Sequence, residues 1–226
     1  MNPYHHSLSS QREHGGPAAD YQSLHNWFDS SKVSLAHFTH RSINHHVQGI
    51  QEAVRHFGPV IVNADGVAVS VETLALQHLA EDMSIIPSAA DWLQHMDLPL
   101  IGGPIRLPAA TPSATELAVA SARHFNTSPA AMFPIHSWFL ETATWFSDAR
   151  HLAMRHTAFG IFQAEQRFGV VIAEHSASPV PTRVAGEWHV RTVMCGRIPA
   201  AADFLRRIKG QPWMAAAHKA HRRGLC

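Results

Sequence analysis

Apolar and small residues recur at intervals of three and four through residues 29–58, a spacing that keeps one face of an α-helix buried. They are Val33, Ala36, Ile43, Val47, Ile50, Val54 and Phe57. Asp29 or Ser30 suits the N-cap of such a helix, and Gly58 suits the position just past its end. The pattern therefore predicts one long helix over residues 29–58.

Four further stretches carry helical patterns or capping signals, and a hairpin lies among them. The helices are expected over residues 3–14, 18–28, 71–83 and 89–96. Two runs of β-branched residues flank Asp65-Gly66, a dipeptide that favours a tight hairpin turn. Gly49 falls inside the predicted long helix, where glycine costs stability against alanine, so a close contact or a kink is expected there.

The same series of elements recurs 111 positions further along the chain. Residues 4–86 and their counterparts share 18 identities in 83 positions, which indicates a duplicated domain. We predict a mainly α-helical fold of two tandem homologous domains, each with a small β-hairpin, that pack on each other as a pseudo-twofold dimer. The predicted parts are a first repeat, a Pro/Gly linker, a second repeat and a basic tail, over residues 1–97, 98–112, 113–214 and 215–226.

Composition and charge narrow the possible partners. The formal net charge is +1 and 46% of the residues are apolar, so a packed core is expected and a nucleic-acid partner is not. No stretch reaches the ~18 uninterrupted apolar residues of a membrane span. Cys195 and Cys226 are expected to be free thiols in a reducing compartment, which suggests a cytoplasmic protein. The partner expected on these grounds is a small molecule or another protein.

Histidine departs from ordinary usage, with 19 in the chain. Because the domain is duplicated, its two copies can be compared position by position. Four of the ten histidines between residues 4 and 86 are matched by histidine, whereas the 14 identities at the other 73 positions would predict about two. The matched pairs are His25/His136, His40/His151, His45/His156 and His78/His189.

Four residues in each copy form the predicted metal site, and imidazole with an occasional carboxylate suits a divalent metal, zinc above all. The two sets are His25, His37, His40 and His78 in the first copy and His136, Asp148, His151 and His189 in the second. His37 and His40 would be neighbours on the long helix. The alternative is that these side chains donate to backbone carbonyls in a helical core and bind nothing. His45 and His156 point away from the main apolar stripe, so we expect them to face the other repeat.

Two carboxylates follow His78 by one helical turn in the first copy only. Glu81 or Asp82 could act as general base on a metal-bound water, while Thr192 and Val193 stand in their places in the second copy. The second copy would then be a structural partner of an active first copy. The plainer alternative is that both carboxylates belong to a solvated helix face.

The segments HNWFDSSK, HRSINHHVQGI, FGPVIVNADG and QHLAEDMSIIPSAADWL resemble a small bacterial and phage domain family of unknown function, in which one unit is often the whole protein. The resemblance covers residues 3–96, and the second copy carries the weaker counterparts HSWF, HTAFGI, GEWH, RIPAAADF and QPWM. The second copy departs from the pattern at Leu140, Ala143, Thr157, Thr192 and Val193. The resemblance supports the fold and implies no reaction.

Two functions follow from these observations. One is a metal-dependent hydrolase, for example of phosphoesters, with the first copy active. The other is a non-catalytic interaction protein, carried by phage or mobile elements as the resemblance implies. An open coordination position beside Glu81 or Asp82 in a pocket favours the enzyme, and a closed or absent site with a large exposed apolar patch favours the binding protein.

Overall fold

The computed structural model describes residues 2–97, 110–172 and 179–214. These residues form two compact units, the first from residues 2–95 and 208–214 and the second from the described part of 96–207. Each unit is mainly helical with one two-stranded antiparallel hairpin, so the predicted mainly α-helical class with a hairpin in each domain is confirmed. The pseudo-twofold packing of the two domains stays a prediction. Most of the predicted linker and the whole basic tail lie outside the described residues. Within the described residues no helix has both the length and the apolar character that a membrane span requires.

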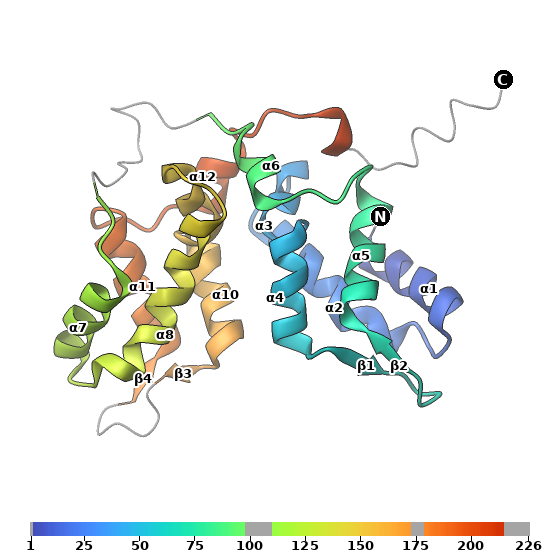
Figure 1. Cartoon of the computed structure of the whole chain (residues 1–226), viewed down its shortest axis with the longest axis horizontal. Helices are drawn as coiled ribbons and strands as arrows, with labels where there is room; N and C mark the ends of the chain where they lie inside the picture. The colour runs from blue at the N-terminus through green and yellow to red at the C-terminus, as the bar shows by residue number, and fades with distance from the viewer. Residues whose placement is uncertain (1, 98–109, 173–178, 215–226) are drawn as a thin grey trace. The chain divides into compact units, whose positions relative to one another are not determined.

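The first unit runs through two helices and a series of short turns into a third long helix, and then returns through a hairpin. Val60 pairs with Ser70 and Val62 with Ala68 in this hairpin, which joins α4 to α5 (Figure 1). The elements are α1 (Pro3–His14), α2 (Ala19–Asp29), η1 (Ser30–Val33), η2 (Phe38–His40), α3 (Arg41–Asn44), α4 (Val47–Phe57), β1 (Val60–Val62), β2 (Ala68–Ser70), α5 (Val71–Asp82), α6 (Ala89–Leu93) and η5 (Pro212–Met214).

The second unit repeats this order of elements. Its hairpin is shorter and pairs Val171 with Pro181 and Ile172 with Val180. The elements are α7 (Ala114–Phe125), α8 (Pro129–Leu140), η3 (Glu141–Thr144), η4 (Ala149–His151), α9 (Leu152–Arg155), α10 (Ala158–Phe168), β3 (Val171–Ile172), β4 (Val180–Pro181), α11 (Thr182–Val193) and α12 (Ala201–Leu205).

The prediction of one long helix over residues 29–58 is wrong, because the chain breaks into four short pieces there. His46 has an extended backbone, and its side chain caps α4 by accepting a hydrogen bond from the amide of Gly49. A Cβ atom at Gly49 would collide with the carbonyl oxygen of Asn44, so the chain can turn back this sharply only with glycine at that position. The apolar spacing continues across the break, which is why periodicity alone gives no sign of it.

The second repeat breaks at the corresponding place. Thr157 is the N-cap of α10 and accepts from the amide of Gly160. A Cβ atom at Gly160 would collide with the carbonyl oxygen of Arg155. The close contact expected at these glycines is therefore present in both units, at the start of a helix.

The inward faces of α2 and α5 position the side chains that matter for function. Along α5 the buried positions follow the helical period and include Leu74, His78 and Asp82, four residues apart. On α2, His25 lies one turn after the fully buried Tyr21. Imidazoles and a carboxylate thus occupy places that the period assigns to the core.

Candidate metal centre

Three imidazoles in the core of the first unit form a continuous chain. His25 Nε2 lies 2.9 Å from Ser10 Oγ, and His25 Nδ1 lies 3.0 Å from His78 Nδ1. The far side of the His78 ring continues the chain, with its Nε2 at 3.0 Å from His45 Nε2. All three histidines are fully buried. They come from α2, α5 and the turn before α4, so the chain crosses the unit.

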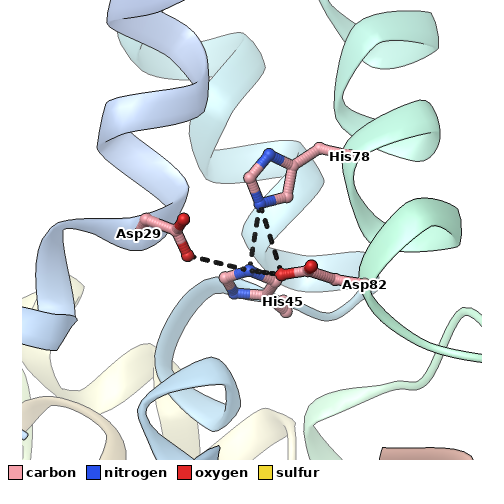
Figure 2. A group of neighbouring side chains, drawn as sticks. All are labelled: Asp29, His45, His78 and Asp82. Carbon is pink, nitrogen blue, oxygen red and sulfur yellow. Dashed lines mark hydrogen bonds and ion pairs between the residues drawn. The ribbon is translucent and has the colours of Figure 1, made fainter. Parts of the chain in front are cut away.

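Two buried carboxylates lie at the His45 end of this chain. Figure 2 shows Asp29, the last residue of α2, and Asp82, the last residue of α5, beside His45 and His78. His45 Nε2 is 3.6 Å from Asp29 Oδ1 and 3.4 Å from Asp82 Oδ2. Asp82 Oδ2 is 4.0 Å from His78 Nε2. One ligand atom from each of the four residues lies within 4.8 Å of all the others.

The hydrogen bonds behind His78 favour a proton on its Nδ1. The Ser10 hydroxyl has acceptors in Gln77 Oε1 at 2.9 Å and the His6 carbonyl at 3.2 Å, so its oxygen can accept from His25 Nε2. His25 Nδ1 then accepts from His78 Nδ1, which leaves the lone pair of His78 on Nε2, facing His45. Buried partners commonly orient metal-binding histidines in this manner. Because two lone pairs 3.0 Å apart repel, a proton or a cation must lie between the two Nε2 atoms.

The electrostatics of the group give the protonation states that a metal requires. Burial holds the pKa of His78 well below its usual value and also lowers the pKa of His45, so both imidazoles are neutral near pH 7. Burial alone would raise the pKa of Asp82, but the neighbouring His45 and His6 and the charge of Arg41 bring it well below its usual range. Neutral imidazoles and ionised carboxylates are the ligand forms that bind divalent cations.

A further histidine, His6, lies beside both carboxylates at the end of α5. His6 Nδ1 lies 2.6 Å from Glu81 Oε2, and His6 Nε2 lies 3.4 Å from Asp82 Oδ1. Burial alone would lower the pKa of His6, but the two carboxylates outweigh it and raise the pKa. His6 thus holds Glu81 and contacts Oδ1 of Asp82, while Asp82 Oδ2 faces His45.

Asp29 is only partly compensated by its basic neighbour. Lys32 Nζ lies 2.6 Å from Asp29 Oδ2, but Oδ1 has no hydrogen-bond partner among the described residues and faces His45. Only 4% of Asp29 is exposed to solvent. A buried carboxylate oxygen without a donor is costly, and a cation at this point would compensate it.

The separations of the four ligand atoms are compatible with one ion. A tetrahedral centre with bonds of about 2.0–2.1 Å has ligand atoms about 3.3 Å apart. Three separations, 3.0, 3.4 and 3.6 Å, lie close to that value, and the distance between His78 Nε2 and Asp82 Oδ2 is longer at 4.0 Å. Two imidazoles and two carboxylates suit zinc and also iron or manganese.

The second unit keeps the imidazole chain. Ser121 Oγ lies 2.7 Å from His136 Nε2, His136 Nδ1 lies 2.8 Å from His189 Nδ1, and His189 Nε2 lies 3.1 Å from His156 Nε2. Burial lowers the pKa of His136 to about 4 and, together with the neighbouring His151 and Arg155, that of His156 to about 3. These imidazoles are neutral near pH 7 as well.

The charged side chains around the three histidines of the first unit are all replaced by uncharged ones in the second unit. The pairs, 111 positions apart, are His6/Leu117, Asp29/Leu140, Lys32/Ala143, Arg41/Leu152, Glu81/Thr192 and Asp82/Val193. Among the described residues, the first unit alone brings histidines and carboxylates together as a metal could require. The three histidines therefore line up without neighbouring carboxylates, and the carboxylates are what distinguish the first unit.

A family model described as "Domain of unknown function (DUF6915)" matches residues 1–100 and again residues 113–214. The chain belongs to the DUF6915 family, as a tandem of two copies. The predicted resemblance to an uncharacterised domain family is thereby confirmed. No curated protein and no solved structure matches the chain.

The first DUF6915 domain distributes the four predicted metal ligands over three environments. His78 belongs to the group just described, and His25 lies behind it, one ring further from the carboxylates. His40 Nδ1 lies 3.3 Å from Ser31 Oγ, and its ring centre is 5.6 Å from that of His45. His37 is exposed, with its Nδ1 at 2.8 Å from Thr39 Oγ1.

In the second DUF6915 domain the predicted set is also divided. His136 and His189 are in contact, whereas His151 Nδ1 lies 3.0 Å from Thr142 Oγ1. Asp148 is the N-cap of η4, where its side chain accepts from the amide of Arg150. Asp148 has an extended backbone and directly precedes η4, so positions 148 and 151 do not lie on one continuous helix as predicted.

Sequence reasoning missed His45 and Asp29 and misplaced Asp82. The expectation that His45 faces the other repeat is wrong, because this side chain is fully buried within its own domain against His78. The histidine match between positions 45 and 156 pointed to a shared role for His45. On the predicted continuous helix, however, His45 would lie ~140° around the axis from His40 and therefore outside the predicted site. The solvated helix face proposed for Asp82 is also wrong, because Asp82 is fully buried.

Proposed function

We propose that this protein binds one divalent cation, with zinc the best match, between Asp29, His45, His78 and Asp82 of its first DUF6915 domain. The observation that carries the proposal is the convergence of four buried ligand atoms from α2, α5 and the turn before α4. The unpartnered oxygen of Asp29 supports it, because a cation is the partner that such an oxygen lacks.

The role we assign to the ion is structural. The four ligands are between 0% and 4% exposed, so the described residues cover them from solvent, whereas a catalytic ion needs access for its substrate. Structural zinc sites have four protein ligands, whereas catalytic sites keep one position open for water or substrate. The ion would join the ends of two helices to a turn, and so stabilise a domain of about a hundred residues.

Hydrolysis has less support from the same geometry. Asp82 is better placed to bind the metal than to take a proton from a bound water, since its Oδ2 faces the imidazoles. Glu81 is engaged by His6 at 2.6 Å. We therefore favour the non-catalytic alternative, in which a metal-centred domain supports binding to a partner.

The duplicated chain provides a matched test of this proposal. Zinc content of the purified full chain and of two variants, His45→Gln and His156→Gln, is measured by elemental analysis and by titration against a chelator. We expect one zinc per chain in the parent protein and in His156→Gln, and at least a hundredfold weaker binding in His45→Gln. Absence of stoichiometric metal, or equal binding by both variants, would refute the proposal in favour of a metal-free charge network.

A further inference from the structure

Residues 208–214 close the first domain although they lie at the end of the second family match. The match covers residues 113–214, yet residues 208–214 group with residues 2–95 in the first compact unit. Backbone hydrogen bonds tie this 208–214 segment to the first domain. The amide of Lys209 donates to the carbonyl of His95 at 3.0 Å, and the amide of Ser84 donates to the carbonyl of Trp213 at 3.2 Å.

One line of contacts leads from this segment to His45. The Trp213 ring packs edge-on against the Trp92 ring, with centres 4.9 Å apart and planes at 72°. Trp92 is fully buried, and its Nε1 donates to the backbone carbonyl of His45 at 3.1 Å. Trp213 thus supports the side chain that holds the backbone of a proposed metal ligand.

A second line leads to Asp82. The carbonyl of Met214 accepts from Arg41 Nη1 at 3.4 Å, and Arg41 Nε donates to Asp82 Oδ2 at 3.1 Å. The Met214 side chain is buried, with 3% of the residue exposed. The bond from Ser84 to Trp213 holds the chain two residues beyond Asp82. The 208–214 segment is therefore connected to two of the four proposed ligands, to His45 through Trp92 and to Asp82 through Arg41.

We infer that the 208–214 segment, contributed by the second repeat, completes the metal centre of the first domain, with Arg41 and Trp92 as positioning residues. The inference rests on the proposed function. Its physical reason is that Asp82 ends a helix and His45 lies in a turn, and such places open most easily by local unfolding. The segment restrains both places, so that the ligands are already in position when the ion binds.

The second domain lacks the parts that would respond to such a segment. Leu152 stands in place of Arg41. The second copy has one inserted residue before Pro199, so Phe204, which has no ring N–H, stands in place of Trp92. These replacements accompany the loss of the carboxylates Asp29 and Asp82. The positioning residues and the charged ligands thus occur together in one copy and are absent together from the other.

The test compares two shortened chains, one ending at Met214 and one ending at Arg207. Zinc affinity is measured by chelator competition. We expect the chain ending at Met214 to bind like the full chain, and the chain ending at Arg207 to bind at least tenfold more weakly. Equal affinity of the two shortened chains would overturn the inference.

Point variants of the full chain keep the test decisive if the shorter chain fails to fold. Trp213→Ala is expected to weaken zinc binding at least fivefold, with Trp213→Phe restoring most of the loss because the ring contact survives. Arg41→Leu should weaken it similarly, and Arg41→Lys should restore part of it because a donor to Asp82 remains. Unchanged affinity in both Trp213→Ala and Arg41→Leu would contradict the inference.

A readout without metal separates this inference from the proposed function. Amide hydrogen exchange is followed in the presence of chelator for the chains ending at Met214 and Arg207. We expect faster exchange in the last turn of α5 and in the turn before α4 of the shorter chain, with α11 unchanged as the internal control. If the full chain binds no zinc, the proposed function fails, and exchange still decides the role of the segment. Identical exchange in both chains would refute that role.

Discussion

At the scale of single residues, the two domains differ in charge and agree in imidazole. Both contain a buried chain of one serine and three histidines, so this chain is a property of the fold. Asp29 and Asp82 occur only in the first domain, where they meet the free end of the chain. A neutral imidazole chain that ends at two ionised carboxylates has the composition of a metal site, whereas one that ends at Leu140 and Val193 does not.

The substitution Asp29→Leu copies the second domain into the first and tests this contrast. At a free zinc concentration a hundredfold above the dissociation constant, ion binding stabilises the parent protein by about 2.7 kcal/mol. We expect the variant to lose nearly all of this increment, because it lacks one of four ligands. The measurement is the urea unfolding midpoint with zinc and with chelator.

Asp148→Leu is the matched control for this substitution. It removes a carboxylate that caps η4 in the second domain and is not part of the four-residue group. Its stability with chelator should fall through the lost cap, by roughly 1 kcal/mol, while its zinc increment stays at the parent value. A full zinc increment in Asp29→Leu would count against the ligand set.

At the scale of elements, the break before α4 places His45 in the proposed site. His45 lies at the turn, and the same turn forces Gly49 against the carbonyl of Asn44. Periodicity located the other helices and the hairpin of the first domain, because their caps and turn residues agree with their apolar pattern. Periodicity failed at residues 29–58, because the apolar residues keep their spacing of three and four across the break and so give no sign of it.

Substitution of Gly49 by alanine distinguishes a broken helix from a continuous one by the sign of its effect. In the middle of a continuous helix, Gly49→Ala would stabilise the protein by up to about 1 kcal/mol. With the observed break, the added Cβ collides with the Asn44 carbonyl, so we expect a loss of at least about 2 kcal/mol.

The control is Gln51→Ala, at an exposed position of α4, which should change the free energy of unfolding by no more than about 0.5 kcal/mol. Both variants are measured by urea unfolding in the presence of chelator. An increase in stability for Gly49→Ala would favour a single continuous helix over residues 29–58, in which His45 could not lie beside His78.

At the scale of the whole molecule, duplication has left one chain with two domains of unequal chemistry. The repeat was visible in the sequence, because matched residues recur at an offset of 111 through residue 86. The assignment of residues 208–214 to the first unit was not, since a position-by-position comparison places them in the second copy. Comparison of the two copies can find only residues that both share. It therefore identified histidines of the shared imidazole chain, whereas the proposed site also needs Asp29 and Asp82, which the second copy lacks.

The proposed ligands of the ion are two imidazoles and two carboxylates of the first domain. Zinc-edge X-ray absorption of the full chain, loaded with one equivalent of zinc, reports these ligands themselves. We expect a four-coordinate ion with two imidazole nitrogens and two carboxylate oxygens, at about 2.0–2.1 Å. A spectrum of hydrated, six-coordinate zinc, or a first shell with three or more imidazoles, would contradict it.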